Sequence, residues 1–296
     1  MRSFCMRAVM VAGLGLSASA CSQPPPPTPP FNLKDPIGGT GTNGLKPALF
    51  HPYGSELDDF AAKPLVNQGT MTVSRAIDTF VTQQPDENAL LVKTVGCALD
   101  SGEIAVDGAL SWPGNGLLST TSRWTTTPLG AGQRRDLLTC IVTRLNPSGT
   151  TVPIWITGAS VNRDPAKGAV GPEPGHFDFT EAHWLATTVD GCRLLAFVWP
   201  SGSWKALCGS ADILTAAART RVCGTREGSA TCDVEIGEDA WCHEEQGQGI
   251  WFCDLPKKYG FPPHQPAIET RLQRQGWRAM HPALEGAGNN ICRAPE

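Results

Sequence analysis

The chain has 296 residues and a formal net charge of −4 at neutral pH. This length allows one large domain or two small ones, and a weakly acidic chain without a basic cluster is not expected to bind nucleic acid. Beyond the first 20 residues, no apolar run is long enough to predict a transmembrane helix.

The first 20 residues have the composition of an export signal peptide. Arg2 and Arg7 give a basic start, residues 8–16 form a short apolar core, and small residues follow. Without the two arginines, the remaining chain has a charge of −6. The sequence Ala18-Ser19-Ala20 fits an ordinary signal-peptidase site. Placed before Cys21, it also forms an acceptable lipobox, although Ala18 stands where Leu is usual.

The segment after Cys21 favours lipidation of that cysteine. Six of the seven residues from 24 to 30 are proline, which predicts a polyproline II spacer of about 20 Å at ~3.1 Å per residue. Ser22, with no Asp at that position, favours sorting to the bacterial outer membrane. We therefore expect Cys21 to anchor the chain in that membrane through a lipid. The alternative is a soluble periplasmic or extracellular protein.

The chain up to residue 160 is expected to comprise a tether and an α+β half. Residues 21–66 are rich in Pro and Gly and are predicted to be the tether, in which Leu49, Phe50 and Tyr53 can dock on the folded body. In residues 67–160, apolar periodicity predicts helices over 72–81, 86–98 and 134–145. Strands are predicted over 103–112, with a turn at Asp107-Gly108, and over 151–157.

Residues 161–296 form a cysteine-rich half with short strand-like runs. Strands are predicted over 193–199, 220–223, 232–236, 250–253 and 267–272. The predicted fold class is therefore α+β, with N-terminal helices packed on a small antiparallel sheet, followed by a disulfide-stapled β-rich half.

The cysteine count links lipidation to disulfide bonding. Cys5 leaves with the signal peptide, and an exported chain with this many cysteines is expected to be braced by disulfides. If Cys21 is lipidated, one of the nine other cysteines is free or pairs between chains; otherwise all ten can pair. The nine are Cys97, Cys140, Cys192, Cys208, Cys223, Cys232, Cys242, Cys253 and Cys292.

Three stretches carry a resemblance to known proteins: LLVKTVGCALDSGE (90–103), LLTCIVTRLNPSGTTVPIWITG (137–158) and RVCGTREGSATCDVEIGEDAWC (221–242). In this order they resemble a group of cysteine-rich exported bacterial proteins, often predicted lipoproteins, over roughly residues 85–272. The chain departs from the group after Cys242, where His243-Glu244-Glu245 stands in place of a second cysteine. The group has no known activity, so the resemblance implies no catalytic residue. It does support a disulfide between Cys97 and Cys140, which would link the two predicted helices that contain them.

Catalytic motifs are weak in this sequence. No G-x-S-x-G nucleophile elbow occurs, and the adjacent pair Glu244-Glu245 is expected to be solvated. His176, Asp178 and His183 are the best metal-site candidates, against the simpler interpretation that they belong to a loop leading into a strand. Cys242-His243 with Cys232 and Cys253 resembles a zinc knuckle, but disulfides are favoured in an oxidising compartment.

Trp199, Trp204, Trp241 and Trp251 are candidates for a binding surface, because exposed Trp side chains bind sugar rings and apolar partners well. The alternative is that they fill space over the disulfides. We expect a non-enzymatic, disulfide-braced cell-envelope lipoprotein that binds a protein or a glycan and needs no cofactor. The alternative function is an exported hydrolase, possibly metal-dependent, with its site near His176, Asp178 and His183.

Overall fold

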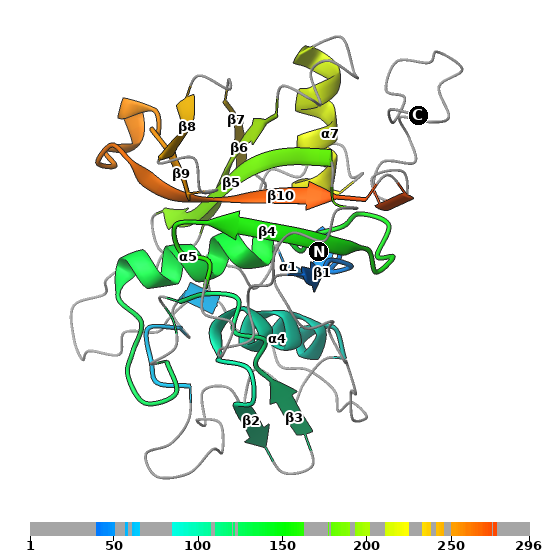
Figure 1. Cartoon of the computed structure of the whole chain (residues 1–296), viewed down its shortest axis with the longest axis vertical. Coiled ribbons are helices and arrows are strands. Elements are labelled where there is room, and N and C mark those ends of the chain that lie inside the picture. Colours follow the sequence, from blue (N-terminus) through cyan, green and yellow to red (C-terminus); the bar gives the residue numbers. More distant parts are fainter. Residues whose placement is uncertain are drawn as a thin grey trace, which may run out of the picture.

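The computed structural model describes residues 40–50, 57–58, 61–65, 85–107, 110–119, 121, 124–162, 177, 179–189, 193–201, 211–224, 233–237, 241–245, 250–273 and 275–276. The predicted signal peptide, Cys21, the proline spacer and the helix predicted over 72–81 lie outside these residues. Within them the chain is a mixed α/β protein with few helices, and most of its elements are strands in sheets (Figure 1).

Eight strands form one large sheet. Its main path runs in the order β1 (Thr40–Thr42), β4 (Pro153–Gly158), β10 (Gln265–Leu272), β5 (Phe179–Val189), β6 (Arg193–Pro200) and β7 (Asp233–Ile236). Neighbours on this path are antiparallel, except for β6 and β7, which are parallel and are connected through helix α7 (Ala211–Cys223). The strands β8 (Cys242–Glu245) and β9 (Ile250–Cys253) pair as a hairpin, and β9 joins the first three residues of β10.

The large sheet combines strands from both sides of residue 160. Strands β1 and β4 precede this position, whereas the other six strands follow it. A separate two-stranded antiparallel sheet, β2 (Ile104–Asp107) with β3 (Leu110–Pro113), lies in the first part of the chain (Figure 1). The strand predicted over 151–157 therefore pairs with the C-terminal strand β10 and does not belong to the small sheet.

Helices are stacked on one side of the large sheet. Helix α5 (Ala131–Val142) packs on β5 and β10, and helix α4 (Pro85–Ala98) packs on α5 and β3. Pro85 suits the first turn of α4 because its backbone lacks an N–H group that would go unpaired there. Cys97 of α4 and Cys140 of α5 form a disulfide, the pair that the resemblance suggested. This bond ties together two helices that together form part of the main core.

Helix α7 closes the same core through a buried ion pair. The pairing of β5 with β10 shifts by one residue, so that Thr270 faces Ala182 and Arg271 faces Thr180. This β-bulge leaves Glu181 between them and turns its carboxylate toward the helices. There it forms an ion pair with Arg221 of α7, and both side chains are fully buried.

Arg221 also connects α7 to the end of α5. Its guanidinium donates hydrogen bonds to the carbonyl oxygens of Thr143 (2.6 Å) and Leu145 (3.2 Å) and lies 4.6 Å from the ring centre of Trp184. Burial lowers the pKa of Arg221 to about 9, so the side chain remains charged at neutral pH. The ion pair is thus a fixed structural link between helix and sheet.

The opposite side of the sheet is covered by the β8–β9 hairpin and the segment that follows it. A second core lies there, formed by Leu185, Leu195, Phe197, Trp199, Cys242, Cys253, Leu255 and Ala267. The short 3₁₀ helix η3 (Lys257–Tyr259) adds Tyr259, whose ring packs edge-on against Phe197 with 5.2 Å between ring centres. Tyr259 also donates a hydrogen bond of 2.5 Å to Glu235 of β7.

Residues 40–50 belong to the fold, although they fall within the predicted tether of residues 21–66. Strand β1 pairs with β4, and the four-residue helix α1 (Pro47–Phe50) follows. Asn43 accepts hydrogen bonds from Asn146 (3.2 Å) and from the backbone of Val152 (3.1 Å). Phe50 is buried in the main core. Apolar periodicity was a poor guide here because the segment has only a few apolar side chains and also makes backbone and polar contacts with residues distant in sequence.

One predicted strand is wrong. Residues 220–223 form the last turn of α7, where Val222 is buried in the main core. A run of four residues is too short to distinguish a strand from the end of a helix by alternation alone. The strands β5 and β8 were not predicted, because polar and charged residues interrupt both of them.

Candidate functional site

The β8–β9 hairpin presents histidine and carboxylate side chains on one of its faces. Cys242 and Cys253 face each other directly across the hairpin and form a disulfide. Both half-cystines are buried in the second core, so the hairpin is fixed to the sheet on that side. Because side chains alternate along a strand, His243 and Glu245 of β8 share the other face.

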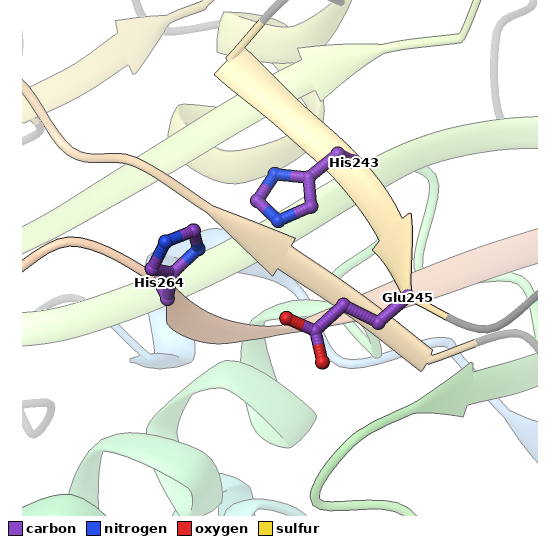
Figure 2. Close-up of side chains that lie close together, drawn as sticks. All are labelled: His243, Glu245 and His264. Atoms are coloured by element: carbon purple, nitrogen blue, oxygen red, sulfur yellow. The ribbon is translucent and has the colours of Figure 1, made fainter.

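Three side chains converge on that outer face. His243 and Glu245 come from β8, and His264 comes from the loop that enters β10 (Figure 2). Each residue has one nitrogen or carboxylate oxygen such that these three atoms lie within 4.8 Å of one another. The two imidazole rings meet edge to face, with 5.1 Å between their centres. Two imidazoles and a carboxylate are a ligand set that zinc uses in proteins.

The backbone around His264 is tightly held. His264 has a φ of 56°, the only positive value for a non-glycine residue in the part of the chain that the structure describes. Its N–H group donates a hydrogen bond of 2.8 Å to the Asp254 carboxylate. The Gln265 side chain donates hydrogen bonds to the carbonyl oxygens of Pro262 (2.7 Å) and Pro263 (3.3 Å). The loop therefore fixes the backbone position from which the His264 side chain extends.

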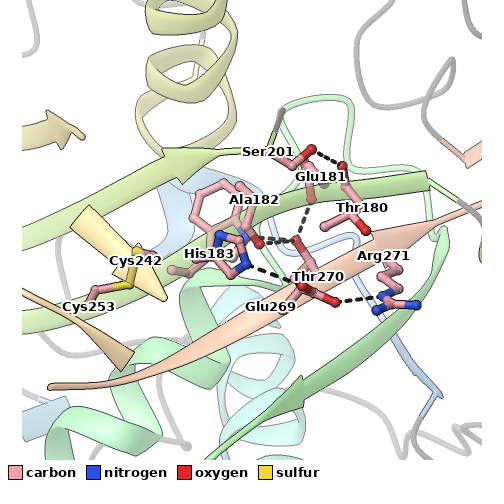
Figure 3. Close-up of polar contacts among 11 residues, drawn as sticks. Thr180, Glu181, Ala182, His183, Ser201, Cys242, Cys253, Glu269, Thr270 and Arg271 are labelled. Atoms are coloured by element: carbon pink, nitrogen blue, oxygen red, sulfur yellow. Dashed lines mark hydrogen bonds and ion pairs between the residues drawn. A yellow bond between two sulfur atoms is a disulfide. The ribbon is translucent and has the colours of Figure 1, made fainter. Parts of the chain in front are cut away.

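His183, one of the three residues predicted to bind metal, has a buried structural position. It lies on β5, only 6% exposed, and its Nε2 is 3.2 Å from Oε2 of Glu269 on β10 (Figure 3). The ring of Trp251 lies over it, with 3.9 Å between ring centres. His176 and Asp178 lie outside the described residues. The structure thus pairs His183 with a different carboxylate from the one that the sequence suggested.

Glu269 is shared between His183 and Arg271. The Arg271 Nε donates to the other carboxylate oxygen at 2.6 Å. Burial acts to raise the pKa of Glu269, but the hydrogen bonds from His183 and Arg271 outweigh it, and the net pKa is lowered. Glu269 is therefore ionised at neutral pH and accepts hydrogen bonds from both neighbours.

The predicted binding-surface tryptophans occupy different environments. Trp199 is fully buried in the second core, and Trp251 is half-buried against His183. Trp241 is 37% exposed just before β8, with its ring centre 6.3 Å from that of Trp199. Trp204 lies outside the described residues. Only Trp241 thus offers an accessible aromatic surface among the three tryptophans that the structure places.

The cysteines that the structure describes are all in disulfides. Cys97 pairs with Cys140, Cys242 pairs with Cys253, and Cys223 at the end of α7 is disulfide-bonded as well. The zinc-knuckle interpretation of Cys242 and Cys253 therefore fails, because their sulfur atoms are joined to each other. Cys21, Cys192, Cys208, Cys232 and Cys292 lie outside the described residues.

Sequence reasoning missed the cluster of His243, Glu245 and His264. A visible signal was the spacing of His243 and Glu245, which places both side chains on one face if the segment is a strand. His264 is 21 residues beyond His243 in the numbering, and its proximity depends on how β9 joins both neighbours.

None of the helices among the described residues is long and apolar enough to cross a membrane. Comparisons of the chain with protein-family models, with curated proteins and with solved structures find no match. Functional conclusions therefore depend on the residues and contacts described above.

Proposed function

We propose that this chain is an exported cell-envelope lipoprotein, anchored through Cys21 in the bacterial outer membrane, with a non-enzymatic binding or structural module as its folded part. Support for export and anchoring comes from the basic and apolar start, the small residues before Cys21 and the proline spacer. The disulfides add support, because such bonds persist in oxidising compartments outside the cytoplasm. In this proposal, helix α4 packed on the small β2–β3 sheet forms the base, and the large sheet with its disulfide-stapled hairpin forms the head.

The binding surface that we assign is the β8–β9 hairpin with Trp241 at its start. Trp241 and Ile104 are the large hydrophobic side chains that are exposed among the described residues, at 37% and 46%. The buried ring of Trp199 supports Trp241 from below, and the Cys242–Cys253 disulfide fixes the adjacent strand. A rigid, accessible indole of this kind can stack on a sugar ring at little entropic cost. We therefore favour an envelope glycan as the ligand, with a protein surface as the alternative.

A hydrolase site around His183 has less support. Nε2 of His183 is engaged by Glu269 and Nδ1 is buried beneath Trp251, so the ring would have to move before it could bind a metal that also reaches solvent. Breaking these contacts would leave the buried Glu269 carboxylate with one hydrogen-bond partner fewer, which costs free energy. The position of His183 is thus better suited to holding the sheet and the hairpin together.

Two measurements test the proposal. The first is the intact mass of the chain purified from its own host. A mass above that of the polypeptide starting at Cys21 by a diacylglyceryl group and an acyl chain supports anchoring; a bare polypeptide contradicts it. Cys21→Ala should abolish the added mass and release the protein from the membrane fraction.

The second measurement is co-sedimentation of the chain without its lipid with purified peptidoglycan sacculi. We expect wild-type protein to co-sediment and Trp241→Ala to remain in solution, because the substitution removes the stacking surface. Ile104→Ala is the matched control, since it removes an exposed hydrophobic side chain from β2, and β2 lies at the other end of the molecule from β8 (Figure 1). Equal sedimentation of wild type and Trp241→Ala would contradict the assignment to Trp241. Absence of wild-type sedimentation would contradict the choice of this glycan.

A further inference from the structure

We propose that His243, Glu245 and His264 bind one zinc ion on the outer face of the β8–β9 hairpin and leave one coordination position open. This site lies on the same hairpin as the proposed glycan surface, but its test requires neither glycan binding nor lipid anchoring. Figure 2 shows the three side chains directed toward a common point above β9. They belong to separate elements, β8 and the loop before β10, so a bound ion would link these two elements across β9.

The separation of the ligand atoms fits a site that closes on a metal ion. Zinc binds imidazole nitrogen and carboxylate oxygen at about 2.0–2.2 Å, which places tetrahedral ligand atoms about 3.4 Å apart. In the cluster, the three atoms lie within 4.8 Å of one another. Rotation of three side chains, of which those of Glu245 and His264 are exposed and that of His243 is half-buried, can bring them into this range. The backbone does not have to move.

The surrounding residues hold the ligands in position before a metal binds. The Cys242–Cys253 disulfide lies next to His243 and fixes the register of the hairpin. On the other side, the Asp254 carboxylate accepts the backbone N–H of His264, whose left-handed backbone is unusual for a residue with a side chain. Uncommon backbone conformations of this kind concentrate at ligand sites. The backbone that carries the three ligands is therefore already ordered before the ion binds.

The donor atoms select the kind of metal. Calcium and magnesium prefer sites made of oxygen atoms, so two imidazoles disfavour both. Imidazole suits zinc and the neighbouring transition metals, among which copper(II) binds most tightly in general. With three protein ligands, the fourth position of zinc would be taken by water or by an atom of a bound molecule, as in zinc sites that are not closed.

The test is calorimetric titration of zinc chloride into the untagged chain without its lipid, with its disulfides intact and any free thiols alkylated beforehand. Alkylation removes cysteine as a competing ligand. We expect one zinc ion per chain. His243→Ala should weaken zinc binding by about 100-fold or more. Losing even a residue that only hydrogen-bonds to a metal ligand lowers metal affinity about 10–100-fold. His264→Asn should do the same while retaining a residue that tolerates the left-handed backbone. Glu245→Gln should weaken binding by about tenfold or more.

Glu244→Gln is the matched control, because Glu244 neighbours Glu245 on β8 but points to the opposite face of the strand. It should bind zinc as the wild type does. Lowering the pH should weaken zinc binding, because protons compete with the metal for imidazole nitrogens. Near-ultraviolet circular dichroism of each variant checks that the fold is retained. The proposal is overturned if the wild type does not bind zinc, or if the folded His243→Ala and His264→Asn variants bind it as tightly as the wild type.

Discussion

Each side of the large sheet buries a glutamate carboxylate, but the partners of the two carboxylates differ. Adjacent residues of β10, Thr270 and Glu269, point to opposite faces, and each takes part in a buried polar group (Figure 3). On the helix side, Thr270 accepts a hydrogen bond from Trp184 (2.7 Å) and donates one to Glu181 (2.8 Å), which pairs with Arg221. On the hairpin side, Glu269 accepts from His183 and Arg271.

The difference lies in how deeply the cations are buried. Arg221 is fully buried beneath α7 with Glu181, and its guanidinium also donates to the backbone carbonyl oxygens of Thr143 and Leu145. On the hairpin side, the Arg271 side chain is 29% exposed, and the strand next to β10 is also fixed by the Cys242–Cys253 disulfide. We infer that the helix side supplies most of the stability and that the hairpin side is the part where conditions can change the protein.

The largest expected effect follows from breaking the helix-side pair. Arg221→Met leaves Glu181 charged and buried without its cation, which should lower the free energy of unfolding by about 3–5 kcal/mol. Urea unfolding followed by tryptophan fluorescence measures the loss. The double variant Glu181→Met/Arg221→Met is the control, because it removes both charges and should recover most of the stability. A single variant as stable as the wild type would show that the pair is not buried as described.

On the hairpin side, loss of the disulfide should have a somewhat smaller effect. Cys242→Ser/Cys253→Ser opens a loop with a sequence separation of 11, and the chain-entropy model gives a loss of about 3 kcal/mol. The same variant should also weaken zinc binding, because His243 is no longer held in register. Thermal unfolding and zinc titration measure the two effects. Unchanged zinc affinity would mean that the hairpin keeps its register through pairing with β10 alone.

The next effect is the pH dependence of the free energy of unfolding that Glu269 contributes on the hairpin side. Because the pKa of Glu269 is lowered in the folded protein, this residue stabilises the fold at neutral pH. That contribution is lost as the pH falls below the unfolded value of about 4.5 and through the lower folded value. Glu269→Gln should lower the free energy of unfolding at pH 7 by about 2 kcal/mol and make it less sensitive to acid. Unfolding in urea at neutral and acid pH tests this, and an unchanged acid sensitivity would contradict it.

The smallest expected effect is stabilisation by zinc. At a free zinc concentration tenfold above the dissociation constant, binding should add about 1.4 kcal/mol to the free energy of unfolding. Differential scanning calorimetry should show a higher melting temperature for the wild type with zinc and no shift for His264→Asn. A shift of the same size in both proteins would point to zinc binding elsewhere.

Local sequence patterns predicted the elements that bury one continuous apolar face. The helix predicted over 86–98 corresponds to α4, and the apolar run at 193–199 corresponds to β6. Strand β5 escaped prediction because Glu181 and His183, which are buried among partners, look in sequence like residues of an exposed loop. Only pairing with β10 and contact with α7 makes their burial favourable, and such partners cannot be read from neighbouring residues.

The candidate sites show the same limit. His183 was selected for its proximity to His176 and Asp178 in sequence, yet its described partner is Glu269, 86 residues away. The cluster of His243, Glu245 and His264 depends on three strands that align in register. The Cys97–Cys140 disulfide was expected from the resemblance to exported cysteine-rich proteins, and the structure contains it.

The position of β10 has a consequence for how the protein is made. It is the last described strand in the chain, yet it lies between β4 and β5 and also pairs with β9. During synthesis, each of these three strands keeps one edge of unpaired backbone groups until residues 265–272 have emerged. The sheet can therefore assemble only after nearly the whole described chain is available. Long-range pairing of this kind is slow, and in this interval the exposed strand edges are open to chaperones and to aggregation.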